Sequence, residues 1–191
     1  MSPVSPDFLK EVKGYIAAMS QKLLAELQHR GGRVCVTPRL FDKLPGYSYT
    51  QPRGYDDGLT GKNVDGLFDG TDAIICEYSA PHDDDLSLIK NQRAGHTVRH
   101  ELGHAFDHYW HGISETGEFK DTYMHELANM DFDQREGKLA YFAQKATAVP
   151  LECFAELFAI IVGGGDSSKV DITLGQYFLK CTQLIRQKLG I

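Results

Sequence analysis

The sequence lacks the features that mark membrane proteins and nucleic-acid-binding proteins. No apolar run approaches the length of about 20 residues that a membrane-spanning helix needs. Acidic residues outnumber basic ones, 26 against 20, and the formal net charge is −6, whereas a nucleic-acid-binding surface requires a basic face. We therefore expect neither a membrane span nor a nucleic-acid partner.

Cysteine is scarce, and no two cysteines form a CxxC motif. Four widely spaced cysteines in 191 residues do not make a disulfide framework, so we expect reduced thiols that behave as small apolar side chains: Cys35, Cys76, Cys153 and Cys181. The opening residues MSPVSPDFLKEVKG also lack the basic-then-apolar order of a secretion signal. We expect either a cytosolic protein or a mature secreted form, and the sequence leaves both open.

The order of predicted elements favours one α+β domain over residues 1–191. An N-terminal α/β part of about 90 residues precedes a mainly helical part of about 91–191. Apolar periodicity and turn residues predict strands over 33–38 and 72–79, and helices over 5–30, 91–110, 120–130, 151–162 and 172–190. We expect the protein to be a monomer.

The segment 41–72 is rich in Gly, Asp and Tyr, and it predicts loop or hairpin structure. It fits neither a phosphate-binding loop, because Asp56 replaces the first glycine, nor an EF-hand, because the acidic positions are incomplete. The segment is either the wall of a cleft or an inert covering.

Five of the eight histidines lie between His96 and His111. Four of them repeat every four residues: His96, His100, His104 and His108. Any adjacent pair therefore lies on one helical face and can bind one metal ion. Arg99 disfavours the first pair, and the last pair encloses AFD, which matches no zinc motif.

The central pair encloses ELG and gives HELGH, the HExxH pattern of zinc peptidases. In this pattern His100 and His104 bind zinc, and Glu101 is the general base for the attacking water. Gly103 leaves room for backbone or substrate near the metal. The competing interpretation is a solvated helix face with titrating histidines.

A catalytic zinc takes three protein ligands and leaves a position for water. The segment ECFAELF offers Glu152 and Glu156, four residues apart on a helix that is apolar nearly all round. Buried carboxylates are rare unless they are paired or bind a metal, so one can be the third ligand and the other can accept the free N–H of a ligand histidine. Cys153 points elsewhere on this helix, toward the core.

The two blocks HELGHAFDHY and ECFAELF, in this order, resemble the catalytic domain of anthrax lethal factor and its relatives, which include the bacterial Pro-Pro endopeptidases. The resemblance covers about residues 92–190. It implies a zincin-like α+β metallopeptidase domain with zinc on His100, His104 and Glu152, and Glu101 as the catalytic base. Glu156 and Asp107 become supporting acids.

The resemblance also implies a tyrosine before the third ligand that stabilises the oxyanion. At the usual distance this chain has Lys145, and the nearest upstream tyrosine is Tyr141. Tyr141 is either this donor or a core aromatic. By the same resemblance the strand at about 72–79 is an edge strand beside the HExxH helix, and substrate adds to it as an extended strand.

We therefore predict a Zn²⁺-dependent endopeptidase acting on protein or peptide. Two alternatives remain: a zincin-fold module that binds zinc without catalysis and serves as a binding or targeting domain, and a metal-free helical interaction protein. The family implies cleavage between prolines only by analogy. For the other histidines we expect solvent or a neighbouring turn for His108 and His111, and a surface position for His96, with the cleft as its alternative.

Overall fold

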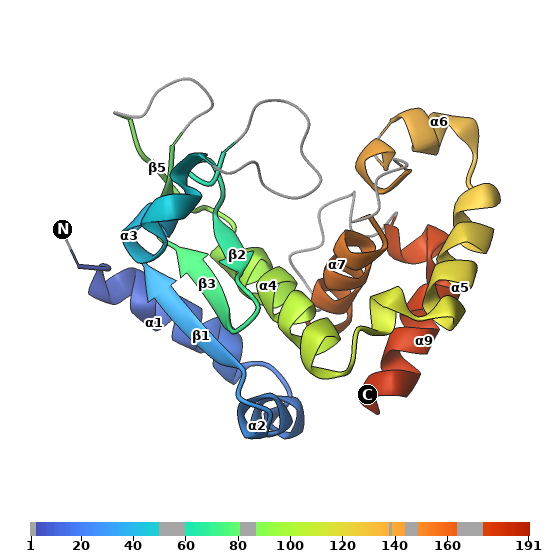
Figure 1. Cartoon of the computed structure of the whole chain (residues 1–191), viewed down its shortest axis with the longest axis horizontal. Helices are drawn as coiled ribbons and strands as arrows, with labels where there is room; N and C mark the ends of the chain where they lie inside the picture. Colours follow the sequence, from blue (N-terminus) through green and yellow to red (C-terminus); the bar gives the residue numbers. More distant parts are fainter. Residues whose placement is uncertain (1–2, 50–59, 81–86, 138, 144–148, 164–173) are drawn as a thin grey trace.

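The computed structural model of the chain describes residues 3–49, 60–80, 87–137, 139–143, 149–163 and 174–191 (Figure 1). Its elements, in chain order, are α1 (Pro6–Ala17), α2 (Gln21–His29), β1 (Arg33–Thr37), α3 (Leu40–Lys43), η1 (Pro45–Tyr49), β2 (Gly66–Phe68), β3 (Asp72–Cys76), β4 (Tyr78–Ser79), β5 (Ile89–Lys90), α4 (Ala94–Tyr109), η2 (Ile113–Glu115), α5 (Gly117–Ala128), α6 (Phe132–Glu136), η3 (Ala140–Ala143), α7 (Val149–Gly163) and α9 (Leu179–Leu189).

The larger sheet has the strand order β1-β3-β2. β1 and β3 are parallel, with Arg33 opposite Asp72, and β2 pairs antiparallel with β3, with Gly66 opposite Ile75. The prediction that the strand at 72–79 is the sheet edge is therefore wrong. β3 is the central strand and is buried at every residue, and the edge strand beside α4 is the short β2.

The predicted strand 72–79 also ends earlier than expected. β3 stops at Cys76, and Tyr78–Ser79 forms β4, which pairs with β5 in a separate two-stranded sheet. Asn91 links this region to α4, because its side-chain amide donates to the Cys76 carbonyl and to Thr97 Oγ1. The start of α4 is thus fastened to the end of the central strand.

The N-terminal segment forms two helices where one was predicted over 5–30. Ser5 caps α1 by accepting a hydrogen bond from the Phe8 N–H, and α1 ends at Ala17. The chain then turns, and α2 begins at Gln21. Met19, in the turn, is buried, so the helical period of apolar residues continues through the break. For this reason the sequence pattern predicts a single helix.

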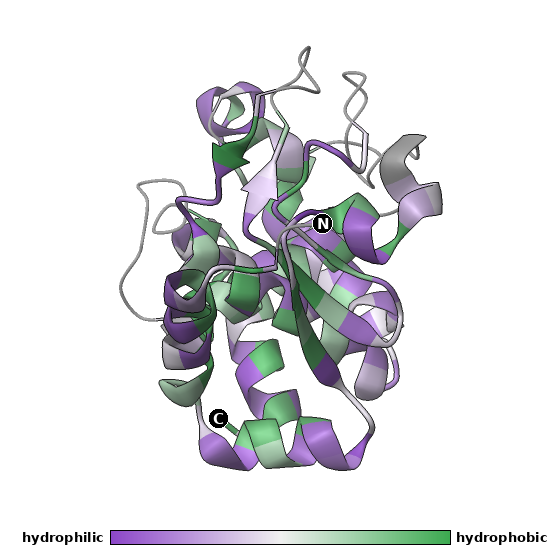
Figure 2. Ribbon diagram, turned by 90° about the vertical axis from the view of Figure 1, so that its left-hand side faces the viewer, coloured by the Kyte–Doolittle hydropathy of each residue, from purple (hydrophilic) through white to green (hydrophobic). Residues whose placement is uncertain are grey.

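The C-terminal half is a group of helices packed around α7, which faces α4 across the middle of the molecule (Figure 1). α7 is buried along most of its length. Hydrophilic and hydrophobic stretches alternate along the helices of the molecule (Figure 2). Buried Glu126 of α5 accepts the backbone N–H groups of Lys180 and Cys181 at the start of α9. This contact fixes the last helix on the bundle.

The predicted helices at 91–110, 120–130 and 151–162 are present as α4, α5 and α7. Of the predicted helix 172–190, α9 covers Leu179–Leu189, and residues 172–173 lie outside the described part of the chain. All four cysteines are free thiols, and Cys76, Cys153 and Cys181 are buried as expected. Among the described residues, no helix combines the length and apolarity needed to cross a membrane.

Candidate metal centre

The candidate metal centre lies between α4 and α7, beside a close contact of the two helix backbones. A Cβ added at Gly103 would lie 2.7 Å from Ala155 Cα and 2.9 Å from the Ala155 carbonyl oxygen. Only glycine permits this approach of two helix backbones. The space that Gly103 leaves is therefore filled by the backbone of α7, and the histidines of α4 face the glutamates of α7.

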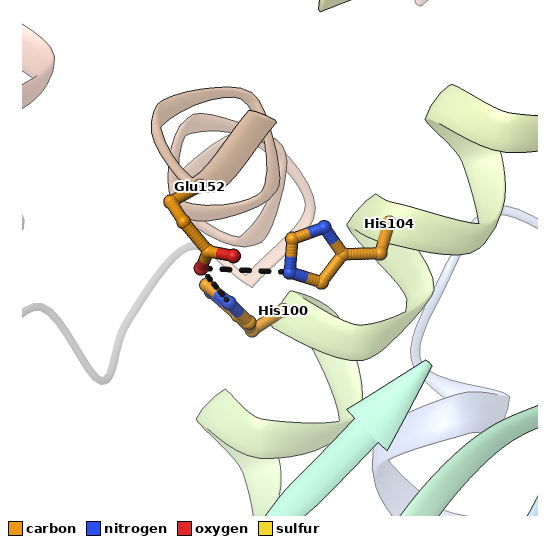
Figure 3. A group of neighbouring side chains, drawn as sticks. All are labelled: His100, His104 and Glu152. Carbon is orange, nitrogen blue, oxygen red and sulfur yellow. Dashed lines mark ion pairs between the residues drawn. The ribbon is translucent and has the colours of Figure 1, made fainter. Parts of the chain in front are cut away.

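Three side chains converge between the two helices, His100 and His104 from α4 and Glu152 from α7 (Figure 3). Glu152 Oε2 lies 3.3 Å from His100 Nε2 and 3.6 Å from His104 Nε2. Bonds of about 2.0–2.2 Å to a tetrahedral zinc place two ligand atoms about 3.3–3.6 Å apart. The two distances from Glu152 match this spacing, and the donor atoms of all three residues lie within 4.8 Å of one another, so this residue set could hold a metal ion such as zinc.

The electrostatics of this group favour a cation. Burial acts to lower the pKa of His100, but Glu152 and Glu156 outweigh it and raise the pKa well above its ordinary value. Burial acts to raise the pKa of Glu152, and the contacts to His100 and His104 reverse the shift and lower it. The carboxylates thus stay ionised and stabilise positive charge beside His100, whether a proton or a metal supplies it.

Glu156 lies behind His100, on the side away from Glu152. Its Oε2 is 2.9 Å from His100 Nδ1, so one glutamate of α7 contacts each nitrogen of the same imidazole. His104 differs, because its Nδ1 is buried without a hydrogen-bond partner among the described residues. Glu156 therefore contacts His100 from behind, and its predicted supporting role stays a prediction.

Asp107 has a different set of partners. Its two carboxylate oxygens accept hydrogen bonds from the N–H and the Oγ–H of Ser114, each at 2.7 Å. The Asp107 carbonyl accepts the Gly112 N–H. Asp107 thus fastens the turn that follows α4, and the structure does not bring it into a hydrogen bond with His104.

Glu101 points to the sheet side of α4. Its carboxylate accepts a hydrogen bond from the Phe68 N–H of β2. A Cβ at Gly66 would lie 2.9 Å from Glu101 Cγ, so β2 passes directly over this residue. Burial raises the pKa of Glu101, although His100 and His104 act to lower it. A raised pKa suits a carboxylate that has to take up a proton.

A cleft of about 1140 Å³ runs past these groups. Glu101, the three candidate ligands and Tyr141 all line it. Tyr141 lies in η3, with its ring edge-on to Phe142 and packed against the core, so both interpretations of this tyrosine remain. Lys145, at the position that the family resemblance indicates, lies outside the described residues.

The described part of the segment 41–70 forms part of the cleft wall and is not merely an inert surface loop. Tyr47 and residues 63–70 line the cleft, and residues 50–59 lie outside the described part. His108 and His111 are exposed, as expected, but both also line the cleft, and the ring of His108 packs against Phe68.

The surface position expected for His96 is wrong. Its side chain is 21% exposed, lines the cleft and contacts Glu156. Sequence reasoning also missed Gly66 and Phe68, which sit in a Gly-rich segment with no strand pattern long enough to recognise. For His96 a signal existed, because the four-residue spacing puts it on the same helix face as His100.

The comparisons with known proteins bear on the fold alone. No protein-family model and no curated protein sequence matches the chain. Among solved structures, the chain is similar to the Pro-Pro endopeptidase PPEP-2 from Paenibacillus alvei, with a TM-score of 0.64 and 18% sequence identity. The match covers 97% of this chain and 93% of that one. The chain thus has the α+β fold of a zincin-like metallopeptidase domain.

Proposed function

We propose that the protein is a zinc-dependent endopeptidase. The observation that supports this most is the convergence of His100, His104 and Glu152, with Glu152 Oε2 at distances from both histidine Nε2 atoms that suit two ligands of one zinc ion. The fold similarity to a Pro-Pro endopeptidase adds support at the level of the fold. In this proposal these three residues hold the metal, and Glu156 fixes the orientation of His100.

The residues around the ligands suit hydrolysis of an amide bond. A bound zinc ion supplies Lewis-acid chemistry, polarising the scissile carbonyl and lowering the pKa of water toward about 7. Glu101 accepts the proton of the attacking water and passes it to the leaving amine. Tyr141, which lines the same cleft, is the candidate hydrogen-bond donor to the developing oxyanion.

The free edge of β2 is the proposed docking place of the substrate backbone. The Cys76 N–H bonds to the Asp65 carbonyl, and the Asp69 N–H bonds to the Asp72 carbonyl, so the odd-numbered residues pair with β3. By the alternation of an antiparallel ladder, the peptide groups of Gly66 and Phe68 point to the other edge, where the Phe68 N–H already donates to Glu101 and the other groups are left for a substrate. An extended peptide would add there as a further strand, with side-chain pockets setting preference.

The test is cleavage of a peptide library, including Pro-Pro sequences, by zinc-loaded protein and by the variant Glu101→Gln. We expect the wild type to cut and the variant to lose about 10²–10⁴-fold in kcat while it binds zinc with the same stoichiometry. Zinc binding without any cleavage by the wild type would favour the catalytically silent module. Equal cleavage by both proteins would contradict the role of Glu101.

A further inference from the structure

His96 lies on α4 one turn before His100. It contacts Glu156, which is not one of the three candidate ligands. Its Nε2 is 2.7 Å from Glu156 Oε1. Its ring also stacks against His100, with centroids 5.9 Å apart and an interplanar angle of 23°. His96 is therefore attached both to the carboxylate behind His100 and to the His100 ring itself.

Glu156 divides its two oxygens between the two histidines. Oε1 contacts His96 Nε2, and Oε2 contacts His100 Nδ1 at 2.9 Å. Each carboxylate oxygen thus has one imidazole nitrogen within hydrogen-bond distance, and a carboxylate oxygen is the acceptor in such a pair. Both histidine nitrogens must then donate. With its proton on Nδ1, His100 keeps the Nε2 lone pair for the metal side.

The hydrogen bond from His96 also restricts the rotation of the Glu156 carboxylate. The terminal torsion of a glutamate side chain is soft, so a carboxylate held by one hydrogen bond can rotate. Two bonds from two imidazoles, both on α4 and one turn apart, fix its plane. Fixing this plane fixes the direction of the His100 ring.

We propose that His96 is a positioning residue of the metal centre: its Nε2–H holds the Glu156 carboxylate so that His100 presents Nε2 to zinc. The inference rests on the proposed zinc site. His96 does not ligate the metal in this arrangement. It acts through Glu156, as an additional outer layer of the kind that raises the affinity of protein zinc sites.

The test compares zinc affinity, measured by competition with a chromophoric chelator, for four proteins. These are wild type, His96→Ala, His96→Gln and the control His29→Ala, which removes an exposed histidine at the end of α2. We expect the zinc Kd to rise about 10-fold in His96→Ala. The glutamine amide reaches about as far as Nε2 and also donates, so His96→Gln should stay within about threefold of wild type.

Several outcomes would overturn the inference. An unchanged zinc Kd in His96→Ala, with zinc still lost in Glu152→Gln, would refute it and leave the proposed function standing. A glutamine variant as weak as the alanine variant would show that the hydrogen bond is not the cause. If zinc affinity is kept and only KM for a cleaved peptide rises, His96 is a substrate contact. No zinc on the wild type would remove the proposed function as well.

Discussion

The candidate site makes different kinds of contact on the two sides of α4. Toward α7, the contacts join side chains: His100 and His104 meet Glu152, and His100 also meets Glu156. Toward the sheet, the contact is with backbone, because Glu101 accepts the Phe68 N–H of β2. In the proposed function, the helix side therefore carries the metal ligands, and the sheet side carries the base and the substrate edge. The two functions should be separable by mutation.

The broadest effect, on both stability and zinc binding, is expected on the helix side, from Gly103→Ala. A methyl group there would press on Ala155 at 2.7 Å and push α7 away from the histidines. We expect a loss of about 1–3 kcal/mol in the free energy of unfolding from overpacking, and at least about a tenfold weaker zinc affinity. Thermal unfolding and chelator competition measure both.

A matched control is Gly14→Ala in α1, where an added Cβ meets nothing within 4 Å. It lies in an exposed helical position, so alanine should be neutral or should stabilise by about 0.5–1 kcal/mol. If Gly103→Ala behaved like Gly14→Ala, the close approach of α4 and α7 would not be what builds the site.

A narrower effect, on catalysis alone, is expected from Tyr141→Phe. If the hydroxyl stabilises the oxyanion, kcat falls by about 10²–10³-fold while zinc affinity and thermal stability stay unchanged. Steady-state kinetics on a cleaved peptide, with zinc saturating, measures this. Unchanged kcat would assign Tyr141 to the core only, and the oxyanion donor would have to be sought elsewhere along the cleft.

The smallest effect is expected on the sheet side, from Gly66→Ala. The added Cβ would lie 2.6 Å from Thr97 Cγ2 and 2.9 Å from Glu101 Cγ, so β2 or the base must shift. We expect kcat/KM to fall by about tenfold or more, since a misplaced base costs rate, while the zinc Kd stays within about threefold. A loss of zinc equal to that in Gly103→Ala would show that the two sides of α4 do not act separately.

The same contrast explains what could be predicted from the sequence. The spacing of His100, His104, Glu152 and Glu156 follows from helix geometry, so the sequence indicates which residues share a face. The helix-to-helix distance depends on Gly103 meeting Ala155, a contact between residues 52 positions apart that no local pattern contains.

The sheet side was less predictable, because strand order depends on pairing between distant segments. β3 lies between β1, about 40 residues earlier, and β2, and neither neighbour is encoded in Asp72–Cys76 itself. A signal was present in the continuous apolar run AIIC, which indicates a strand buried on both faces and hence a central one. β2 has three residues, too few to show alternation.

The zinc content of the purified protein is the most direct test of the central claim, that His100, His104 and Glu152 form one metal site. It should be measured by mass spectrometry on tag-free protein, for the wild type beside Glu152→Gln. We predict about one zinc per chain in the wild type and a sharp reduction in the variant, because a neutral amide replaces the charged ligand. No zinc on the wild type after reconstitution, or the same zinc content in both proteins, would contradict the account.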